Sequence, residues 1–255
     1  MLTSRDIRKG RFALLFGFTL LSTAFWGQAA ATIPSGSLST GVIVQRMEES
    51  NRERAQRLQN YTATRHYQVE YHGFPATVKA SMDVDVVYDA PASKRFTIVS
   101  QSGSKLLVDR VLKRLLTSEQ EAATNQARSA LTTDNYNFTL IGSEVEDGRR
   151  LYALVVEPKT DGKLLYRGKI WVDATDYAVV RVEAEPAQNP SFWIKKTEIH
   201  HLYAKTGDFW LPVSNRSVTK VRIGGTAVLT IDYGTYKIGA VTPPASPPSQ
   251  TSTGR

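Results

Sequence analysis

Apolar and polar positions alternate along two segments of the chain, and this period of two predicts β-strands. Over Thr62–His72, the apolar residues Tyr67, Val69 and Tyr71 fall on one face and polar residues fall on the other. The alternation is more regular over Thr77–Tyr88, where one face carries Val78, Ala80, Met82, Val84, Val86 and Tyr88. Such a pattern is typical of a sheet with one face in water and one against a core. A shorter third strand is predicted over Lys94–Ser100.

The C-terminal half also reads as strands, because turn signals divide it at strand spacing. Asp147-Gly148, Asp161-Gly162 and Gly224-Gly225 are pairs that tolerate the positive φ of tight hairpin turns. Seven successive strands are predicted, over Asn137–Glu146, Arg149–Glu157, Lys163–Asp173, Tyr177–Ala184, Ser191–Ala204, Asp208–Arg222 and Thr226–Ile238. Connections this short join antiparallel neighbours, because a parallel partner requires a crossover of about a dozen residues. We therefore predict an antiparallel meander.

Two segments break the strand pattern and favour helices. Thr40–Asn60 has no proline, is rich in Arg, Glu and Gln, and carries a sparse apolar stripe, which predicts an amphipathic helix. Ser104–Leu131 holds several leucines and then a stretch rich in Glu, Ala and Gln, which predicts a second helical segment from Val111 onward. The apolar run Leu106–Val108 is ambiguous and is also compatible with the start of a strand.

Together these elements predict an α+β, mainly β fold. A sheet of about ten strands curls instead of staying flat, so we expect a strongly curved antiparallel sheet, an unclosed half-barrel. Its dry concave face must be covered, and the two helical segments are the available lid. Where they do not fill the concavity, an apolar cavity remains.

The N-terminal 31 residues read as a secretory signal peptide. Basic residues within Met1–Arg11 precede the apolar run Phe12–Trp26, and the small residues Ala29–Ala31 are typical of a cleavage site. A retained anchor is the alternative, but the run is shorter than the roughly 20 residues that span a bilayer. The predicted domain then covers residues 32–239. The tail 240–255 is rich in Pro, Ser and Thr and is predicted to be disordered.

Composition narrows the setting and the partners. The chain has no cysteine, which excludes both a disulfide framework and the acylated cysteine of a bacterial lipoprotein. We therefore expect a periplasmic protein with at most transient membrane contact. A net charge of +8, part of it in the signal peptide, is too weak to indicate nucleic acid as a partner.

The sequence offers little for catalysis, metal or cofactor binding. His200 and His201 are neighbours on a predicted strand and point to opposite faces, while His66 and His72 lie about 20 Å apart at strand rise. Carboxylates such as Asp83 alternate with apolar residues, as on a solvated strand face. No nucleophile elbow, P-loop or His-Glu-x-x-His motif occurs. We expect no enzyme, no metal site and no cofactor, and no convergent polar cluster in the concavity.

Two stretches carry a resemblance to a known family. Residues 166–173 read Tyr-Arg-Gly-Lys-Ile-Trp-Val-Asp, and 176–183 read Asp-Tyr-Ala-Val-Val-Arg-Val-Glu; Phe-Trp-Leu-Pro at 209–212 is a further feature. With the order of elements over about 40–238, this resembles the LolA/LolB-type outer-membrane lipoprotein-sorting carriers and the related MucB/RseB-type sensor domains. The resemblance implies a half-barrel that holds acyl chains.

The function expected from these features is a carrier that binds a lipid or the acyl chains of a lipoprotein. A bound chain gains about 0.8 kcal/mol per buried methylene, so about ten methylenes outweigh any surface ion pair. An alternative on the same scaffold is a protein-interaction or lipid-sensing module with an envelope protein as its partner. The predicted cavity wall, for which plain core packing is the alternative, comprises Tyr67, Tyr71, Met82, Val84, Tyr166, Ile170, Val180 and Val182.

Overall fold

A computed structural model describes residues 38–91, 93–162, 164–189, 192–222 and 224–239. The predicted signal peptide and the predicted tail lie outside these residues. No helix within the described ranges is long and apolar enough to cross a membrane.

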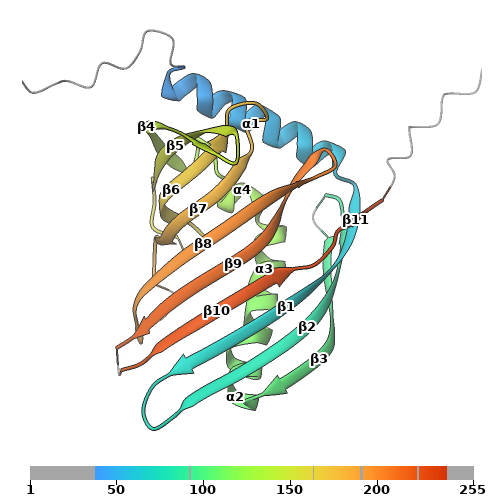
Figure 1. Ribbon diagram of the computed structural model, residues 1–255, viewed down its shortest axis with the longest axis vertical. Helices are drawn as coiled ribbons and strands as arrows, with labels where there is room; N and C mark the ends of the chain where they lie inside the picture. Colours follow the sequence, from blue (N-terminus) through green and yellow to red (C-terminus); the bar gives the residue numbers. More distant parts are fainter. Residues whose placement is uncertain (1–37, 92, 163, 190–191, 223, 240–255) are drawn as a thin grey trace, which may run out of the picture. The chain divides into compact units, whose positions relative to one another are not determined.

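One antiparallel sheet dominates the fold, as the strand pattern predicts (Figure 1). Its order is β3-β2-β1-β10-β9-β8-β7-β6-β5-β4, so that β3 and β4 form its two edges and the sheet does not close into a barrel. The bounds are β1 Asn60–His72, β2 Thr77–Asp89, β3 Ser93–Gly103, β4 Tyr136–Glu146, β5 Arg149–Pro158, β6 Tyr166–Asp173, β7 Val179–Pro186, β8 Ile194–Thr206, β9 Phe209–Val221, β10 Thr226–Tyr233 and β11 Lys237–Ile238. The strands β4–β10 form the meander, and its last strand, β10, pairs with β1 of the first hairpin, so that both parts belong to one sheet.

The last predicted strand is two strands in the structure. β10 ends at Tyr233, and β11 resumes the pairing with β1 opposite Tyr61 and Thr62. Between them Gly234 donates its N–H to the Thr64 carbonyl at 2.8 Å, and a Cβ at this glycine would lie 2.8 Å from that oxygen. The irregular turn directs Tyr236 into the core, where its hydroxyl donates to the Pro212 carbonyl.

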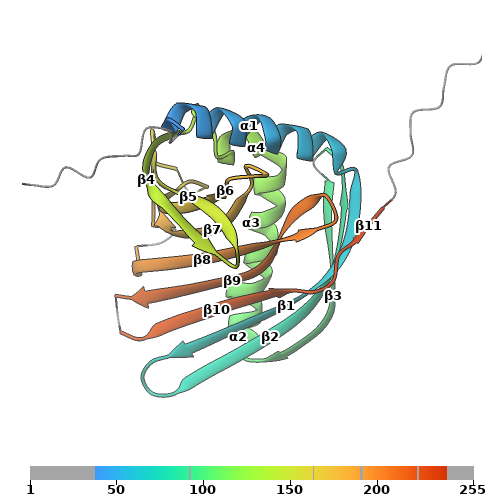
Figure 2. The ribbon, with the colours of Figure 1, turned by 45° about the horizontal axis from the view of Figure 1, so that its top comes forward.

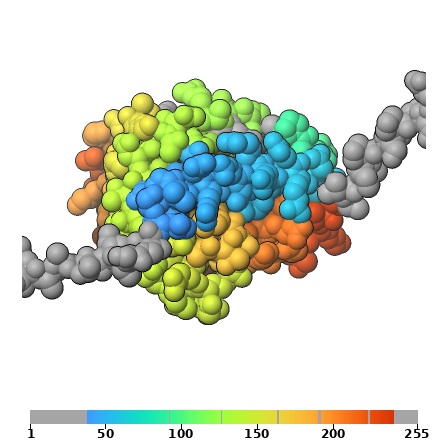
Figure 3. All heavy atoms as spheres, turned by 90° about the horizontal axis from the view of Figure 1, so that it is seen from above, coloured from blue at the N-terminus to red at the C-terminus, as the bar shows by residue number. Residues whose placement is uncertain are grey.

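The helices lie on the concave side and across one end of the sheet (Figure 2), and α1 runs over the surface of that end (Figure 3). α1 (Thr40–Arg57) confirms the first predicted helix; the hydroxyl of Ser39 caps it by accepting the Val42 N–H. The second segment is helical from its start, so the strand alternative for Leu106–Val108 is wrong. Its parts are α2 Lys105–Leu107, the π-helical turn η1 Val108–Leu112, α3 Lys113–Thr124 and α4 Gln126–Ser129.

On the concave side of the sheet, the core consists of two separate apolar clusters. The α3-side core contains the buried residues of β1, β2, β9 and β10 that pack against Val108, Leu112 and Leu116. The spacing of four between these three residues places them on one helix face. The α1-side core contains the buried residues of β4–β7 that pack against Ile43, Val44 and Met47. Each helical element thus covers its own part of the concave face.

Candidate functional site

A cavity of about 220 Å³ lies between α1 and the concave face of the sheet. Its lining comes from α1, the segment after α4 and strands β6–β9, and it comprises Asn51, Arg54, Leu131, Tyr166, Ala178, Val179, Val182, Tyr203 and Trp210. Burial raises the pKa of the Tyr203 hydroxyl to about 12, which shows how poorly this space would solvate a charge. The volume is below the roughly 300 Å³ at which ordinary ligand pockets begin.

Six of the eight residues predicted to line the cavity lie on the concave face. Tyr67, Met82 and Val84 are buried in the α3-side core. Ile170 and Val182 are buried in the α1-side core, and Tyr166 packs against it. Only Tyr166 and Val182 border the 220 Å³ cavity, because the other four are covered by neighbouring side chains.

Val180 lies on the opposite face, contrary to the simple alternation. The pairing of β6 with β7 shifts at this point: Trp171 pairs with Arg181, but Val172 pairs with Val179. Val180 is therefore the extra residue of a β-bulge, which reverses its direction relative to Val182. It packs with Trp171, Leu151 and Ala153 in a small cluster on the convex face.

Tyr71 is only half-buried and belongs to neither core cluster. It lies near the end of β1, where its hydroxyl donates to the Gly224 carbonyl at 3.0 Å. Gly225 approaches the same ring so closely that a Cβ there would lie 2.7 Å from the tyrosine oxygen. Tyr71 thus joins the ends of two hairpins.

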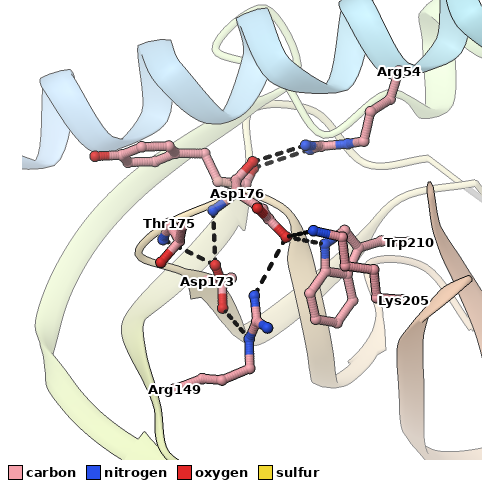
Figure 4. A network of polar contacts seen from close by, with 8 residues as sticks. Arg54, Arg149, Asp173, Thr175, Asp176, Lys205 and Trp210 are labelled. Carbon is pink, nitrogen blue, oxygen red and sulfur yellow. Dashed lines mark hydrogen bonds and ion pairs between the residues drawn. The ribbon is translucent and has the colours of Figure 1, made fainter. Parts of the chain in front are cut away.

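The C-terminal half of α1 is fastened to the sheet by polar contacts (Figure 4). Arg54 reaches the turn between β6 and β7, where its guanidinium donates to the carbonyls of Asp176 at 2.8 Å and Tyr177 at 3.2 Å. Arg57 forms an exposed ion pair with Asp208 in the turn between β8 and β9. Since the buried apolar residues of α1 all lie in its first half, these polar contacts hold its second half.

The two sequence features behind the family resemblance meet in this polar network. Asp173 ends the first feature, and its Oδ1 accepts the N–H groups of Thr175 and Asp176, which shapes the turn. The Asp176 carboxylate accepts from the Trp210 indole at 2.9 Å and from Lys205 at 2.9 Å (Figure 4). The features therefore have a structural role: they join three hairpins and α1.

α3 is fastened to the concave face by a buried ion cluster. Arg65 of β1 points inward, and its side chain is 0% exposed. Its Nη1 donates to both oxygens of Glu119 on α3, at 2.7 and 2.9 Å. Lys94 of β3 donates to the same carboxylate at 2.6 Å. Burial alone opposes the charge on Glu119, but Lys94 and Arg65 outweigh it and hold the pKa of this carboxyl below its ordinary value.

Aromatic rings enclose the Arg65 guanidinium. The Tyr233 ring centroid lies 4.5 Å and the Phe96 centroid 5.8 Å from its central carbon, and Nη1 also donates to the Tyr67 hydroxyl at 3.3 Å. Desolvation by itself would lower the pKa of Arg65, but Glu119, Tyr67 and Tyr233 together raise it further than burial lowers it. Arg65 is therefore a permanent positive charge inside the concavity.

His201 of β8 lies on the same interior face. Its Nδ1 is 3.3 Å from the Tyr203 hydroxyl, and desolvation lowers the pKa of the imidazole from 6.5 to about 4. His200, its neighbour, is exposed on the other face, as the alternation predicts. No group of three His, Cys, Asp or Glu side chains within the described ranges is placed to hold a metal ion.

The polar cluster of Arg65, Lys94, Glu119 and His201 is the part of the site that the sequence analysis missed. The expectation of no convergent polar cluster in the concavity is therefore wrong. One signal was present: Arg65 occupies an inward position two residues before Tyr67, where the alternation calls for an apolar side chain. An arginine at such a position requires a buried partner, and that partner is 54 residues further along the chain.

Comparisons with known proteins give matches of low identity. A model of a family of unknown function (DUF5686) matches residues 128–237. No curated protein sequence matches the chain. Among solved structures, the chain is similar to a DUF1329 family protein from Desulfovibrio piger, with 12% identity and a TM-score of 0.41 over 79% of this chain and 94% of that one.

Other structural matches include a LolA superfamily protein and MucB, the two kinds of protein that the sequence resembles. A LolA superfamily protein from Nitrosomonas europaea shows 10% identity and a TM-score of 0.33 over 81% of this chain and 96% of that one. MucB, in the Pseudomonas aeruginosa MucA/MucB complex, shows 8% identity and a TM-score of 0.25 over 76% of this chain and 99% of its own.

Proposed function

We propose that this protein is a periplasmic carrier that binds the acyl chains of a lipid or lipoprotein against the concave face of its sheet. One observation carries the proposal: the apolar concave face is covered by two helical elements that polar contacts fasten at a few points. Arg54 and Arg57 hold the end of α1, and Glu119 holds α3. The exposed ion pair of α1 exchanges readily for water, so the end of α1 can separate from the sheet at moderate cost. Separating Glu119 from the buried Arg65 costs more, unless another anion takes its place.

In the state described, most of the predicted cavity wall is covered by the packing of the two core clusters, so entry of an acyl chain requires a helix to move. The 220 Å³ cavity under α1 is the space already present. Displacing α3 would uncover apolar side chains on β1 and β2, including Tyr67, Met82 and Val84. An acyl chain would cover them again, at about 0.8 kcal/mol per buried methylene. Ligand binding and helix displacement are thereby coupled.

The polar cluster of Arg65, Lys94, Glu119 and His201 is compatible with binding and does not require covalent chemistry. Both oxygens of Glu119 accept hydrogen bonds from cations, so this carboxylate is not available as a base. The lowered pKa keeps His201 neutral at neutral pH. We therefore propose a carrier and not an enzyme.

Displacement of α3 can be measured directly, because the chain has no native cysteine. Spin labels at Ser118→Cys on α3 and Gln68→Cys on the outer face of β1 report the distance between helix and sheet. We expect palmitate to lengthen this distance, as seen by double electron–electron resonance. Labels at Gln68→Cys and Thr62→Cys, both on β1, serve as the control and should not change. An unchanged helix-to-sheet distance at saturating palmitate, with no copurified lipid in native mass spectrometry, would rule out the carrier.

Transient membrane contact is best supported at the end of the sheet that carries the β1–β2, β7–β8 and β9–β10 connections. Phe74, Phe192 and Trp193 are 97%, 76% and 56% exposed. The Arg222 N–H donates to the Trp193 carbonyl, and Tyr71 ties the neighbouring turn to β1. The Arg222 guanidinium lies 5.2 Å from the Phe192 ring centroid, and exposed aromatic rings beside a cation suit an anionic membrane interface.

We expect the double variant Phe74→Ser/Phe192→Ser to bind vesicles of anionic phospholipid about tenfold more weakly than the unaltered protein. Co-sedimentation with the vesicles measures this difference. Val145→Ser, which removes an exposed apolar side chain from the edge strand β4, is the matched control. Equal binding by the double variant and the control would contradict this assignment.

The sheet edges favour a second candidate, a protein-interaction module. β4 is an edge strand and exposes the apolar side chains of Ile141 and Val145. An exposed apolar edge is a template on which a partner can add a strand. A stoichiometric complex with an envelope protein that Ile141→Lys/Val145→Lys abolishes would support this function over the carrier.

A further inference from the structure

Arg65 has more hydrogen-bond donors than partners, although it is fully buried. Among the described residues, Glu119 and Tyr67 accept from Nη1, while Nε and Nη2 are buried with no partner. Those two atoms form one edge of the guanidinium fork, the edge that binds a carboxylate or phosphate through two parallel hydrogen bonds. A buried donor without a partner is unfavourable, so this edge calls for an acceptor.

The charges of the cluster are also unbalanced. Arg65 and Lys94 are two cations that share the single carboxylate of Glu119. The side chain of Lys94 is only 16% exposed, so water screens it poorly. His201 adds no negative charge. The interior of the half-barrel therefore holds a positive charge that nothing among the described residues compensates.

Displacement of α3 would enlarge this imbalance. Glu119 lies on α3, whereas Arg65 and Lys94 lie on strands that remain in the sheet. The movement that admits an acyl chain therefore also removes the carboxylate from both cations. A neutral ligand would leave two poorly solvated positive charges in the concavity, whereas an anionic ligand would replace the lost partner.

We propose that the ligand is an anionic amphiphile whose carboxylate or phosphate head replaces Glu119 as the partner of Arg65 and Lys94 and binds the Nε–Nη2 edge of Arg65. Its acyl chain lies on the apolar concave face beneath α3. In the absence of ligand, Glu119 acts as an internal substitute for the head group. This inference rests on the proposed carrier function and specifies the class of its ligand.

The comparison that tests the proposal needs no variant. Palmitate and hexadecanol have chains of the same length and differ in the charge of the head. Native mass spectrometry and calorimetry with the full chain should show palmitate bound roughly tenfold to a hundredfold more tightly, since charged hydrogen bonds are at stake. Equal affinities would overturn the anion site and leave the carrier standing. Binding of neither ligand would overturn the carrier itself.

Variants then assign the head-group site to Arg65. In Arg65→Met the preference for palmitate over hexadecanol should fall to within about threefold, because the main cation that faces the head group is gone. Arg95→Gln is the matched control and should keep the preference. It removes an exposed arginine of β3 that pairs with Asp89 at the end of β2. A preference retained in Arg65→Met would place the head elsewhere and overturn the assignment.

Inorganic phosphate separates the amphiphile from a free anion. The proposal expects phosphate alone to bind far more weakly than palmitate, because it lacks the chain that holds α3 away from the sheet. Phosphate binding as tight as that of palmitate, and lost in Arg65→Met, would identify a site for a free anion and overturn the amphiphile.

Discussion

Glu119→Gln should lower the free energy of unfolding by about 3 kcal/mol, whereas Arg65→Met should change it by less than about 1 kcal/mol. The reason for this asymmetry is the count of charges. Removing Glu119 leaves Arg65 and Lys94 in a poorly solvated interior without their shared partner. Removing Arg65 leaves Glu119 still paired with Lys94, and it also removes the two unpartnered nitrogens Nε and Nη2. Methionine can fill the vacated apolar space between Tyr233 and Phe96.

The effect of Glu119→Gln is placed near the lower end for a broken buried pair, because this side chain is 25% exposed. Urea unfolding followed by tryptophan fluorescence gives both free energies by linear extrapolation. Glu121→Gln, an exposed change two residues away on α3, is the matched control and should be neutral. Arg65→Met proving more harmful than Glu119→Gln would show that the interior positive charge is compensated after all.

Local signals were sufficient to predict most of the fold. A period of two reports the buried face of a strand, and an Asp-Gly or Gly-Gly pair reports a hairpin, so the strands and their antiparallel order follow from neighbouring residues. The pairing of β1 with β10 joins residues more than 150 positions apart, and no local pattern encodes it. The bulge that turns Val180 outward is equally hidden, because it depends on how β6 and β7 fit together.

The candidate site was less predictable, because its polar half depends on tertiary contacts. An apolar position such as Val84 or Ile170 can be assigned to the interior from its own strand. Arg65 and Glu119 are each ordinary surface residue types, and only the packing of α3 against β1 makes them an interior pair. The same holds for His201, whose burial follows from the curvature of the sheet and not from its sequence neighbours.

His201 should make the protein less stable as the pH falls from 6.5 toward 4.5. Desolvation lowers the pKa of the folded imidazole to about 4, with Glu119 opposing and Arg65 reinforcing the shift. In this range the unfolded chain binds a proton at His201 that the folded chain does not bind, so stability decreases with falling pH. The expected loss is about 2 kcal/mol. Glu119 adds its own loss only at lower pH, since its pKa lies below 4.5 and its ion pairs persist until the pH falls through that lowered value.

His201→Gln keeps a polar side chain within reach of Tyr203 but cannot take up the proton, so its stability should vary by about 2 kcal/mol less over this range than that of the unaltered protein. Urea unfolding at pH 6.5, 5.5 and 4.5 provides the comparison. His200→Gln is a matched control, because it changes the adjacent residue on the exposed face of the same strand and should retain the full pH dependence. If His200→Gln and His201→Gln had equal slopes, the imidazole of His201 would have to be solvated, and the concave face of β8 would have to be open to water in the ligand-free protein.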